Sequence, residues 1–207
     1  MKVRFDEIDA KLRYKLMTAA IIPRPVALVT TLDKAGNANA APYSFFNGMS
    51  EDPPLVVLGL KRRDAGPKKD TARNIEETGE FVVNMVNWEM HGGMLVTAAD
   101  FPEGVDEIPL AGFSHAECEV VKPPRLAEAP VAFECKKYVT VQAGIDRDIA
   151  IGEVVAMHVR DDMWDAERQY IDWLGELPIA RLWGTLYARL GEPIDGPVPD
   201  PKTFTGD

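Results

Sequence analysis

The chain has 207 residues, enough for one domain with a hydrophobic core of its own. Hydrophobic residues make up 46% and charged residues 27%, a globular balance that argues against disorder. The formal net charge of −10 argues against binding to nucleic acid or an anionic membrane, because both would be repelled, although a local patch of donors could still hold a phosphorylated ligand.

The first nine residues are charged and lack the apolar stretch of a signal peptide, and no apolar run reaches the length of a membrane span. The two cysteines, Cys118 and Cys135, form no Cys-x-x-Cys pair. A disulfide between paired strands is conceivable, but buried free thiols are the preferred interpretation. We therefore expect a soluble cytoplasmic protein.

Two helical patterns and a set of short apolar runs organise the first half of the chain. Apolar residues at helical spacing predict an amphipathic helix over 8–20, which Pro23 and Pro25 end. A second helix is predicted over 70–78, with Asp70 as its N-cap and Gly79 as its stop. A third is expected over 88–99. Apolar and β-branched runs predict strands at 25–31, 37–41, 55–60 and 81–86.

The second half is predicted to be mainly strands, after a long loop over 101–113 that crosses the surface or a ligand. Strands are expected over 116–121, 132–141 and 148–159, and the last alternates as a half-buried antiparallel strand does. A helical patch is expected over 165–174, and 182–190 fits either a strand or a helix.

Strands joined by hairpins, with helices inserted between them, favour a mainly β fold, an antiparallel barrel, over a doubly wound parallel sheet. One domain is expected over 1–194 and an extended tail over 195–207, rich in proline and glycine. In a dimer, such a tail could wrap around the partner.

The segment Asn39 to Phe46 is the most informative one for function. Its small residues would let a flat ring approach the backbone, Ser44 adds a hydroxyl, and three aromatic rings could form walls. Tight packing inside a barrel explains the same composition, and from composition alone it is the preferred interpretation.

A second candidate lies at the predicted N-terminus of the helix over 70–78. Free N–H groups and the helix dipole favour an anion there, and Lys69 and Thr71 could contribute. A capped surface helix is the alternative, and Asp70 fits it better because its charge opposes a phosphate. Arg62 and Arg63 could offset that charge. The chain contains no glycine-rich phosphate loop.

Metal binding and nucleophilic hydrolysis find no support in the sequence. The three histidines are scattered, no Gly-x-Ser-x-Gly elbow occurs, and no cysteine has a histidine at a recognisable spacing. His158 lies on the small-residue face of its predicted strand, where it could touch a ring or donate a proton. A satisfied or solvent-facing histidine is the simpler interpretation.

The order and spacing of several segments resemble the flavin-reductase-like family of FMN-binding split barrels, over about residues 16–194. No single motif is decisive. The matching segments are Ile-Pro-Arg-Pro-Val-Ala-Leu-Val-Thr-Thr at 22–31, Asn39 to Phe46, Lys-Asp-Thr-x-x-Asn-Ile at 69–75, Phe-Val-Val-Asn at 81–84, Ile-Gly-Glu-Val at 151–154 and Leu-Gly-Glu-Pro-Ile at 190–194.

The resemblance implies a Greek-key split barrel that forms a homodimer, with FMN near the subunit interface and NAD(P)H as electron donor. It places Arg24 and Pro25 beside the flavin, the phosphate end at Lys69, Asp70 and Thr71, and His158 as a further ring contact and a weak catalytic candidate. The isoalloxazine ring and ribityl chain would be lined by Asn39, Ala41, Pro42, Tyr43, Ser44 and Phe45.

Three functions remain open at this point. The leading hypothesis is an NAD(P)H-dependent reductase of bound or exchangeable FMN, which needs no catalytic triad because the cofactor supplies the chemistry. The alternatives are an FMN oxidoreductase with another small substrate and a non-enzymatic FMN-binding or electron-relay protein. A split barrel of the pyridoxamine-phosphate oxidase type ranks lower, because Pro-Arg-Pro and Lys-Asp-Thr fit the reductase branch better.

Overall fold

A computed structural model describes residues 1–61, 68–173 and 175–205. Its main element is an antiparallel sheet with the strand order β2-β1-β5-β8-β9-β4-β3, which confirms the predicted mainly β, antiparallel architecture. The strands are β1 (Ala27–Leu32), β2 (Ala38–Tyr43), β3 (Phe46–Glu51), β4 (Pro54–Lys61), β5 (Glu80–Met85), β8 (Val131–Gln142) and β9 (Arg147–Val159).

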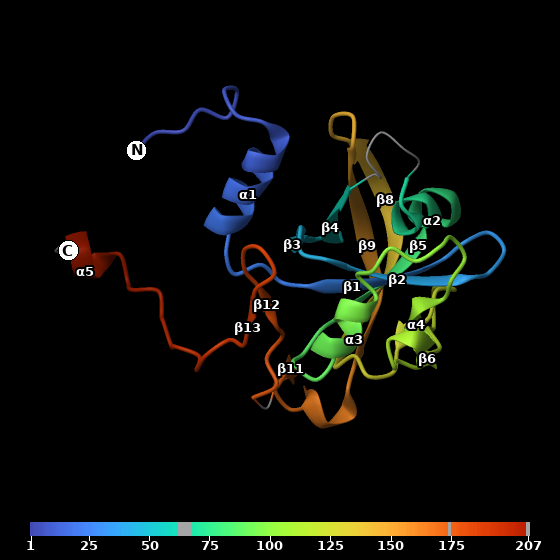
Figure 1. Ribbon diagram of the computed structural model, residues 1–207. Coiled ribbons are helices and arrows are strands. Elements are labelled where there is room, and N and C mark those ends of the chain that lie inside the picture. Colours follow the sequence, from blue (N-terminus) through green and yellow to red (C-terminus); the bar gives the residue numbers. More distant parts are fainter. Residues whose placement is uncertain (62–67, 174, 206–207) are drawn as a thin grey trace.

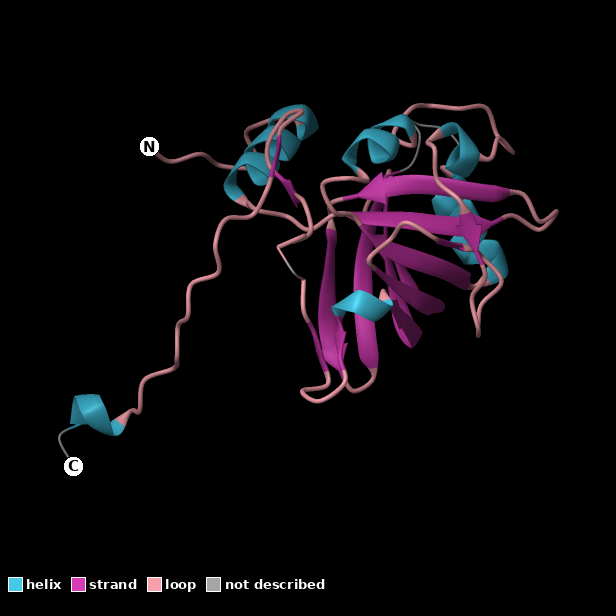
Figure 2. Ribbon diagram, turned by 90° about the horizontal axis from the view of Figure 1, so that it is seen from below, coloured by secondary structure: helices cyan, strands magenta, loops and turns pink. Residues whose placement is uncertain are grey.

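The sheet curls on itself so that its two edge strands meet at one corner (Figure 2). These edges, β2 and β3, are consecutive in the chain, with only Ser44 and Phe45 between them. The Gly59 N–H of β4 donates to the Phe45 carbonyl at 2.7 Å, which ties the corner to the sheet. The site described below lies at this corner.

Strand β1 is covered on both faces, as its uninterrupted apolar run predicts. Ala27 and Val29 belong to the core inside the curled sheet, together with Phe81 of β5. Leu28 between them points the other way, into a second core that includes Met94. The period of two along a strand therefore sends neighbouring residues into separate cores.

Helices and small hairpins surround the sheet (Figure 1). The helices are α1 (Ala10–Ala20), α2 (Asp70–Thr78), α3 (His91–Val96), α4 (Glu107–Leu110), the 3-10 helix η1 (Asp161–Met163) and α5 (Lys202–Thr205). The short strands pair as β6 (His115–Ala116) with β7 (Arg125–Leu126), β10 (Trp164–Asp165) with β11 (Tyr170–Ile171), and β12 (Ala180–Arg181) with β13 (Tyr187–Ala188). No described helix is long and apolar enough to cross a bilayer.

Several predicted elements are confirmed and others are wrong. The helices over 8–20 and 70–78 are α1 and α2, and Gly79 ends α2 with φ of 75°. Asp70 is not the N-cap, however, because Lys69 holds that position, and its side chain accepts no capping hydrogen bond. The helix over 88–99 shortens to α3, and the loop over 101–113 contains the single turn α4.

Two predicted elements fail for identifiable reasons. The strand over 116–121 is absent beyond Ala116, because the N–H groups of Glu119, Val120 and Val121 bond to the Glu134 carboxylate instead of to a neighbouring strand. The helical patch over 165–174 is the β10–β11 hairpin in its described part, and Leu174 lies outside the described residues. The Asp165 carboxylate accepts the first N–H groups of that turn.

Candidate functional site

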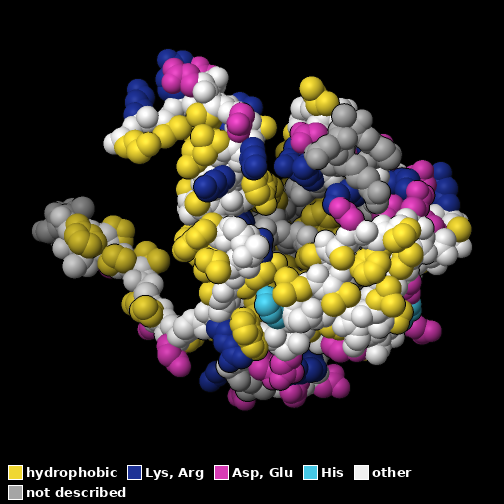
Figure 3. Space-filling model, in the orientation of Figure 1, with side chains coloured by type: hydrophobic (Ala, Val, Ile, Leu, Met, Phe, Trp, Pro, Cys, Tyr) yellow, Lys and Arg dark blue, Asp and Glu magenta, His cyan; other side chains and the backbone are white. Residues whose placement is uncertain are grey.

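A cavity of about 750 Å³ lies at the β2–β3 corner, bounded by α1, the start of α2 and the segment 97–107. Its volume is within the range of small-molecule sites. The space-filling view shows a hollow between α1 and the body of the protein, with basic side chains around it (Figure 3). Both predicted segments line this cavity, through Asn39, Ala41, Pro42, Tyr43, Ser44 and Phe45 and through Lys69, Asp70 and Thr71.

Strand β2 carries the first group of lining residues. Asn39, Ala41 and Tyr43 alternate on one face, while Ala40 between them is fully buried in the second core. Burial raises the pKa of the Tyr43 hydroxyl to about 12, so it is neutral at physiological pH. Ala41 and Pro42 contribute only small side chains to this wall.

The N-terminus of α2 forms one end of the cavity. The side chain of Lys69 does not cap the helix, so it accepts no hydrogen bond from the N–H groups of the first turn. Free N–H groups at a helix N-terminus favour a bound anion. The Lys69 ammonium lies 3.3 Å from the Asp100 carboxylate. Asp70 pairs with Arg73 at 2.9 Å, which offsets part of the negative charge that opposes a phosphate. Arg62 and Arg63, predicted to offset it, lie outside the described residues.

Glu107 is a site residue that the sequence analysis missed. The turn α4 places its carboxylate against β2, where it accepts the Ala40 N–H at 2.9 Å and the Asn39 side-chain amide at 3.0 and 3.2 Å. Burial raises the pKa of Glu107, while the bonds from Ala40 and Asn39 act in the opposite direction. The only signal in the sequence is an acidic residue in a loop that was expected to cross the surface or a ligand.

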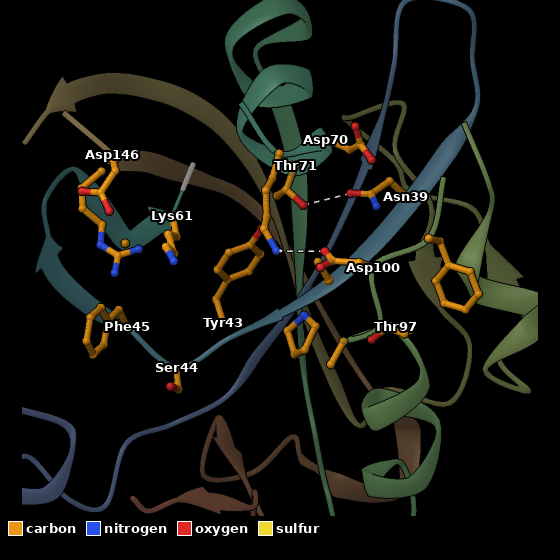
Figure 4. A pocket seen from close by; sticks show the side chains of 18 of the residues that line it. Asn39, Tyr43, Ser44, Phe45, Lys61, Asp70, Thr71, Thr97, Asp100 and Asp146 are labelled. Atoms are coloured by element: carbon orange, nitrogen blue, oxygen red, sulfur yellow. Dashed lines mark hydrogen bonds and ion pairs between the residues drawn. The ribbon is translucent and has the colours of Figure 1, made fainter. Parts of the chain in front are cut away.

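The opposite wall comes from residues that no single motif contains. Tyr14 of α1 lies with its ring centroid 6.1 Å from that of Phe45, at an interplanar angle of 54°. Lys61 and Arg147 are direct partners in the β4–β9 register, and both line the cavity. Figure 4 shows Lys61 on the same side as Phe45, together with Asp146. Because these residues come from a helix and two distant strands, sequence spacing alone could not group them.

Arg24 and Pro25, expected beside the flavin, are not among the residues that line the cavity. Arg24 is buried behind Ser44, with its Nε 3.4 Å from the Ser44 hydroxyl. Its guanidinium donates to the carbonyls of Thr18, Ile21 and Leu182 at 2.5–2.7 Å. Arg24 thus joins the end of α1 and the C-terminal hairpin to the cavity wall.

His158 is also outside the lining of the cavity. Its Nε2 lies 2.6 Å from the carboxylate of Glu134, which also accepts three backbone N–H groups. Cys118 lies close enough to complete a Cys–Glu–His cluster, its three ligand atoms within 4.8 Å of one another. All four acceptor positions of the carboxylate are used by these donors, so the cluster is arranged to anchor the segment 118–121. Both cysteines are free thiols, as expected, but only Cys135 is buried, whereas Cys118 is half-buried.

The described lining contains no histidine and no cysteine. It offers instead a helix N-terminus with Lys69 and Asp70 at one end, small side chains on β2, and a buried polar group formed by Asn39, Thr71 and Glu107. Such an arrangement suits a ligand that brings its own reactive group.

Comparison with known proteins identifies the class. The family model "Flavin reductase like domain" matches residues 18–175, so the chain belongs to the flavin-reductase-like family. The "Uncharacterized protein YwrF" of Bacillus subtilis is 41% identical over 192 residues, which cover 90% of this chain and 93% of YwrF. The "NADH:riboflavin 5'-phosphate oxidoreductase" of Streptomyces pristinaespiralis is 28% identical over 142 residues, which cover 69% of this chain and 74% of that protein.

Solved structures agree with this assignment. Nitrilotriacetate monooxygenase component B from Bacillus cereus has a TM-score of 0.89 at 38% identity, covering 94% of this chain and 98% of that one. Pseudomonas fluorescens 2-nitrobenzoate 2-nitroreductase NbaA has a TM-score of 0.87 at 36% identity, covering 96% of both.

A structure from Shewanella frigidimarina, described as a flavin reductase with a split barrel domain, matches in fold with a TM-score of 0.82 at 19% identity. The match covers 96% of this chain and 100% of that one. The predicted family and split barrel are thereby confirmed, and the family supports an oxidoreductase that uses flavin.

Proposed function

We propose that the protein is an FMN-dependent oxidoreductase that takes hydride from NAD(P)H, with FMN in the cavity at the β2–β3 corner. The observation that carries the proposal is the meeting of both predicted segments in one cavity, with the N-terminus of α2 at one end. A family model that covers residues 18–175 supports flavin as the ligand. A 28% identical relative named for NADH and riboflavin 5'-phosphate supports the two nucleotides.

The residues present fit FMN. Lys69, Thr71 and the first N–H groups of α2 would hold the phosphate, while Asn39, Ala41 and Tyr43 would lie against the ring and ribityl chain. When bound, the flavin supplies the redox chemistry, since it accepts a hydride and passes the electrons on. The protein binds and orients the reactants and excludes water from the face that β2 covers.

A second candidate is an oxidoreductase that passes the electrons to another small substrate within the same cavity. The wall of Tyr14, Phe45, Lys61 and Arg147 combines two rings with two cations, which suits an aromatic acid. The 36% identical nitroreductase, named for 2-nitrobenzoate, favours this alternative.

The same proposal includes a homodimer with the flavin near the subunit interface, in the cytoplasm. Helix α1 supports the dimer, because Leu12, Tyr14 and Met17 are 40–53% exposed although the helix borders the cavity. His158 is proposed as a ring contact only if the partner subunit brings a flavin near it.

The first test is FMN binding. Wild-type protein titrated with FMN should give a bound flavin spectrum. The double variant Lys69→Ala/Thr71→Ala should bind FMN at least about tenfold more weakly, because it loses the ammonium at the phosphate end and the hydroxyl that ties the N-terminus of α2 to Asn39. Lys34→Ala, a lysine 70% exposed, is the matched control. Full affinity in the double variant would contradict the phosphate assignment.

The second test separates the functions. NADH or NADPH oxidation that rises with added free FMN supports a flavin reductase. Oxidation of NADH or NADPH that depends on an added nitroaromatic acid, while FMN stays bound to the protein, supports the second candidate. Tight FMN binding without oxidation of either nucleotide would contradict both enzymes and favour an electron-relay protein.

A further inference from the structure

The charges that line the cavity are divided unevenly between its two ends. Figure 4 shows Asn39 and Asp70 at the end formed by α2, and Phe45, Lys61 and Asp146 at the other end. Among the described lining residues, the α2 end carries one cation and three carboxyl groups, Lys69 against Asp70, Asp100 and Glu107. An excess of acid is what a chain with a net charge of −10 leads us to expect.

The other end has the opposite balance, and we call it the basic end. Lys61 of β4 and Arg147 of β9 line it, and Asp146 is the carboxylate at the same end. Lys11 adds a third cation from α1, since it lines the cavity and lies one helical turn before Tyr14, which packs at this end. Three cations against one carboxylate give the described lining of the basic end a positive excess.

Lys61 and Arg147 are held side by side although their charges repel. They are Cα partners in the antiparallel ladder of β4 and β9, so their side chains leave the sheet on the same face. Leu58 and Leu60 fill the core, which leaves Gly59 and Lys61 of β4 facing the cavity. Like charges directly opposite each other destabilise a sheet. An anion between the two side chains would replace that repulsion with two attractive contacts.

An aromatic surface adjoins the two cations. Phe45 lies against the backbone of Gly59, where an added Cβ would come within 2.9 Å of the Phe45 Cβ. Because Gly59 and Lys61 share a face of β4, Phe45 and Lys61 are neighbours at the basic end (Figure 4). The Tyr14 ring completes the surface, with its centroid 6.1 Å from that of Phe45. Both residues remain partly open, since Tyr14 is 53% exposed and Phe45 is 38% exposed.

We propose that Lys61 and Arg147 form a second anion subsite, separate from the proposed FMN phosphate site, for the molecule that exchanges electrons with the flavin. The subsite binds a carboxylate or phosphate of that molecule through N–H donors, while Phe45 and Tyr14 hold its aromatic ring. The inference rests on the proposed function. A nicotinamide nucleotide as electron donor and an aromatic acid as electron acceptor share this chemistry, and the experiment below distinguishes them.

The double variant Lys61→Gln/Arg147→Gln removes both charges and keeps polar side chains. It is compared with the wild type as FMN-loaded protein, with NADPH as the anionic donor and para-nitrobenzoate as the anionic acceptor. The KM of at least one of the two should rise at least about tenfold, because the charged contacts to it are lost. The dissociation constant of FMN, measured by quenching of flavin fluorescence, should change by less than about twofold.

A matched variant and two neutral probes separate charge recognition from damage to the cavity. Lys34→Gln/Lys122→Gln removes two charges from exposed lysines outside the described lining and should behave as the wild type. N-benzyldihydronicotinamide donates hydride without carrying a phosphate, and para-nitrobenzamide is the neutral counterpart of the acceptor. Both should react equally with the wild type and with Lys61→Gln/Arg147→Gln. Equal losses with the charged and the neutral probes would overturn the proposal.

The two anionic probes identify the occupant. A rise in KM confined to NADPH assigns the subsite to the electron donor, and a rise confined to para-nitrobenzoate assigns it to the acceptor. Unchanged KM values for both would overturn the proposal. So would a loss of FMN affinity of about tenfold, because Lys61 and Arg147 would then bind the phosphate of FMN itself.

Failure of the proposed function is recognisable in the wild type alone. If the wild type binds no FMN or oxidises neither nucleotide, the proposed function fails, and this inference falls with it. If the wild type does both and Lys61→Gln/Arg147→Gln keeps its KM values, only the anion subsite is contradicted.

Discussion

Glu107 and Glu134 are both buried, yet their surroundings shift their pKa values in opposite directions. For Glu107, burial is the largest influence and the pKa rises. For Glu134, burial also acts to raise the pKa, but the N–H groups of the segment 119–121 together with His158 outweigh it and lower the pKa to about 2. The difference lies in the number of donors that each carboxylate receives.

Glu134 should therefore stabilise the fold in a pH-dependent way. Its pKa is 4.5 when unperturbed and about 2 in the folded protein, so its stabilisation is full above about pH 4.5 and is lost as the pH falls toward 2. We expect Glu134→Gln to lower the free energy of unfolding by about 2–3 kcal/mol at pH 7, measured with urea.

The difference between Glu134→Gln and the wild type should shrink as the pH falls below about 4.5, since the wild-type side chain then becomes neutral as well. Glu117→Gln, on an exposed residue, is the control. A difference that stays constant down to pH 3 would show that the charge of Glu134 does not contribute.

The sequence predicted the lining residues on β2 and α2, because each group is contiguous and was matched to a family pattern. It could not predict Glu107 or the role of Glu134. Both carboxylates act on backbone or amide groups far away in the chain, and nothing in their local sequence records the partner. Arg24 was expected beside the flavin, but its bonds to three carbonyls place it behind the cavity wall.

At the scale of elements, strand β9 depends on a glycine for close packing. A Cβ atom at Gly152 would lie 2.3 Å from the Phe81 ring, closer than any real contact allows. Phe81 is fully buried in the core inside the curled sheet, so its ring has little room to move. This packing gives a physical reason for the Ile-Gly-Glu-Val segment that contributed to the family resemblance.

Gly152→Ala should therefore destabilise the protein by about 2–3 kcal/mol, the usual cost of overpacking a core, as measured by chemical unfolding. Gly48→Ala on β3 is the matched control, because a Cβ there meets nothing within 4 Å. Phe81→Leu in the Gly152→Ala background should recover part of the loss if the ring is the obstacle. Equal stabilities of Gly152→Ala and Gly48→Ala would contradict the packing argument.

Strong local patterns allowed the strands β1, β4, β5, β8 and β9 and the helices α1 and α2 to be predicted from the sequence. Strand β3 was missed because its residues, Phe46–Glu51, are polar or exposed and lie at a sheet edge, where burial imposes little alternation. The strand expected over 116–121 failed because a distant carboxylate competes for its N–H groups. Tertiary contacts overrode the local pattern in that segment.

At the scale of the whole molecule, two segments carry apolar groups that the chain itself leaves uncovered. Leu12 and Met17 of α1 are 40% and 42% exposed, although the helix was predicted to be amphipathic. The residues after Leu190 extend away from the body of the protein in both ribbon views, on the side where α1 lies in Figure 1. A partner subunit on this side would cover both segments.

Removal of residues 191–207 should weaken self-association. Ile194 and Val198 are each 93% exposed and Phe204 is 77% exposed, so a partner that covers them would bury apolar surface that the monomer leaves in water. We expect the dissociation constant of the homodimer to rise at least about tenfold in the chain that ends at Leu190, measured by sedimentation at several concentrations. Ile194→Ser/Val198→Ser in the full chain should give a smaller change in the same direction. A wild type that stays monomeric would contradict the homodimer, whereas equal dissociation constants for the full and shortened chains would exclude only the tail from its interface.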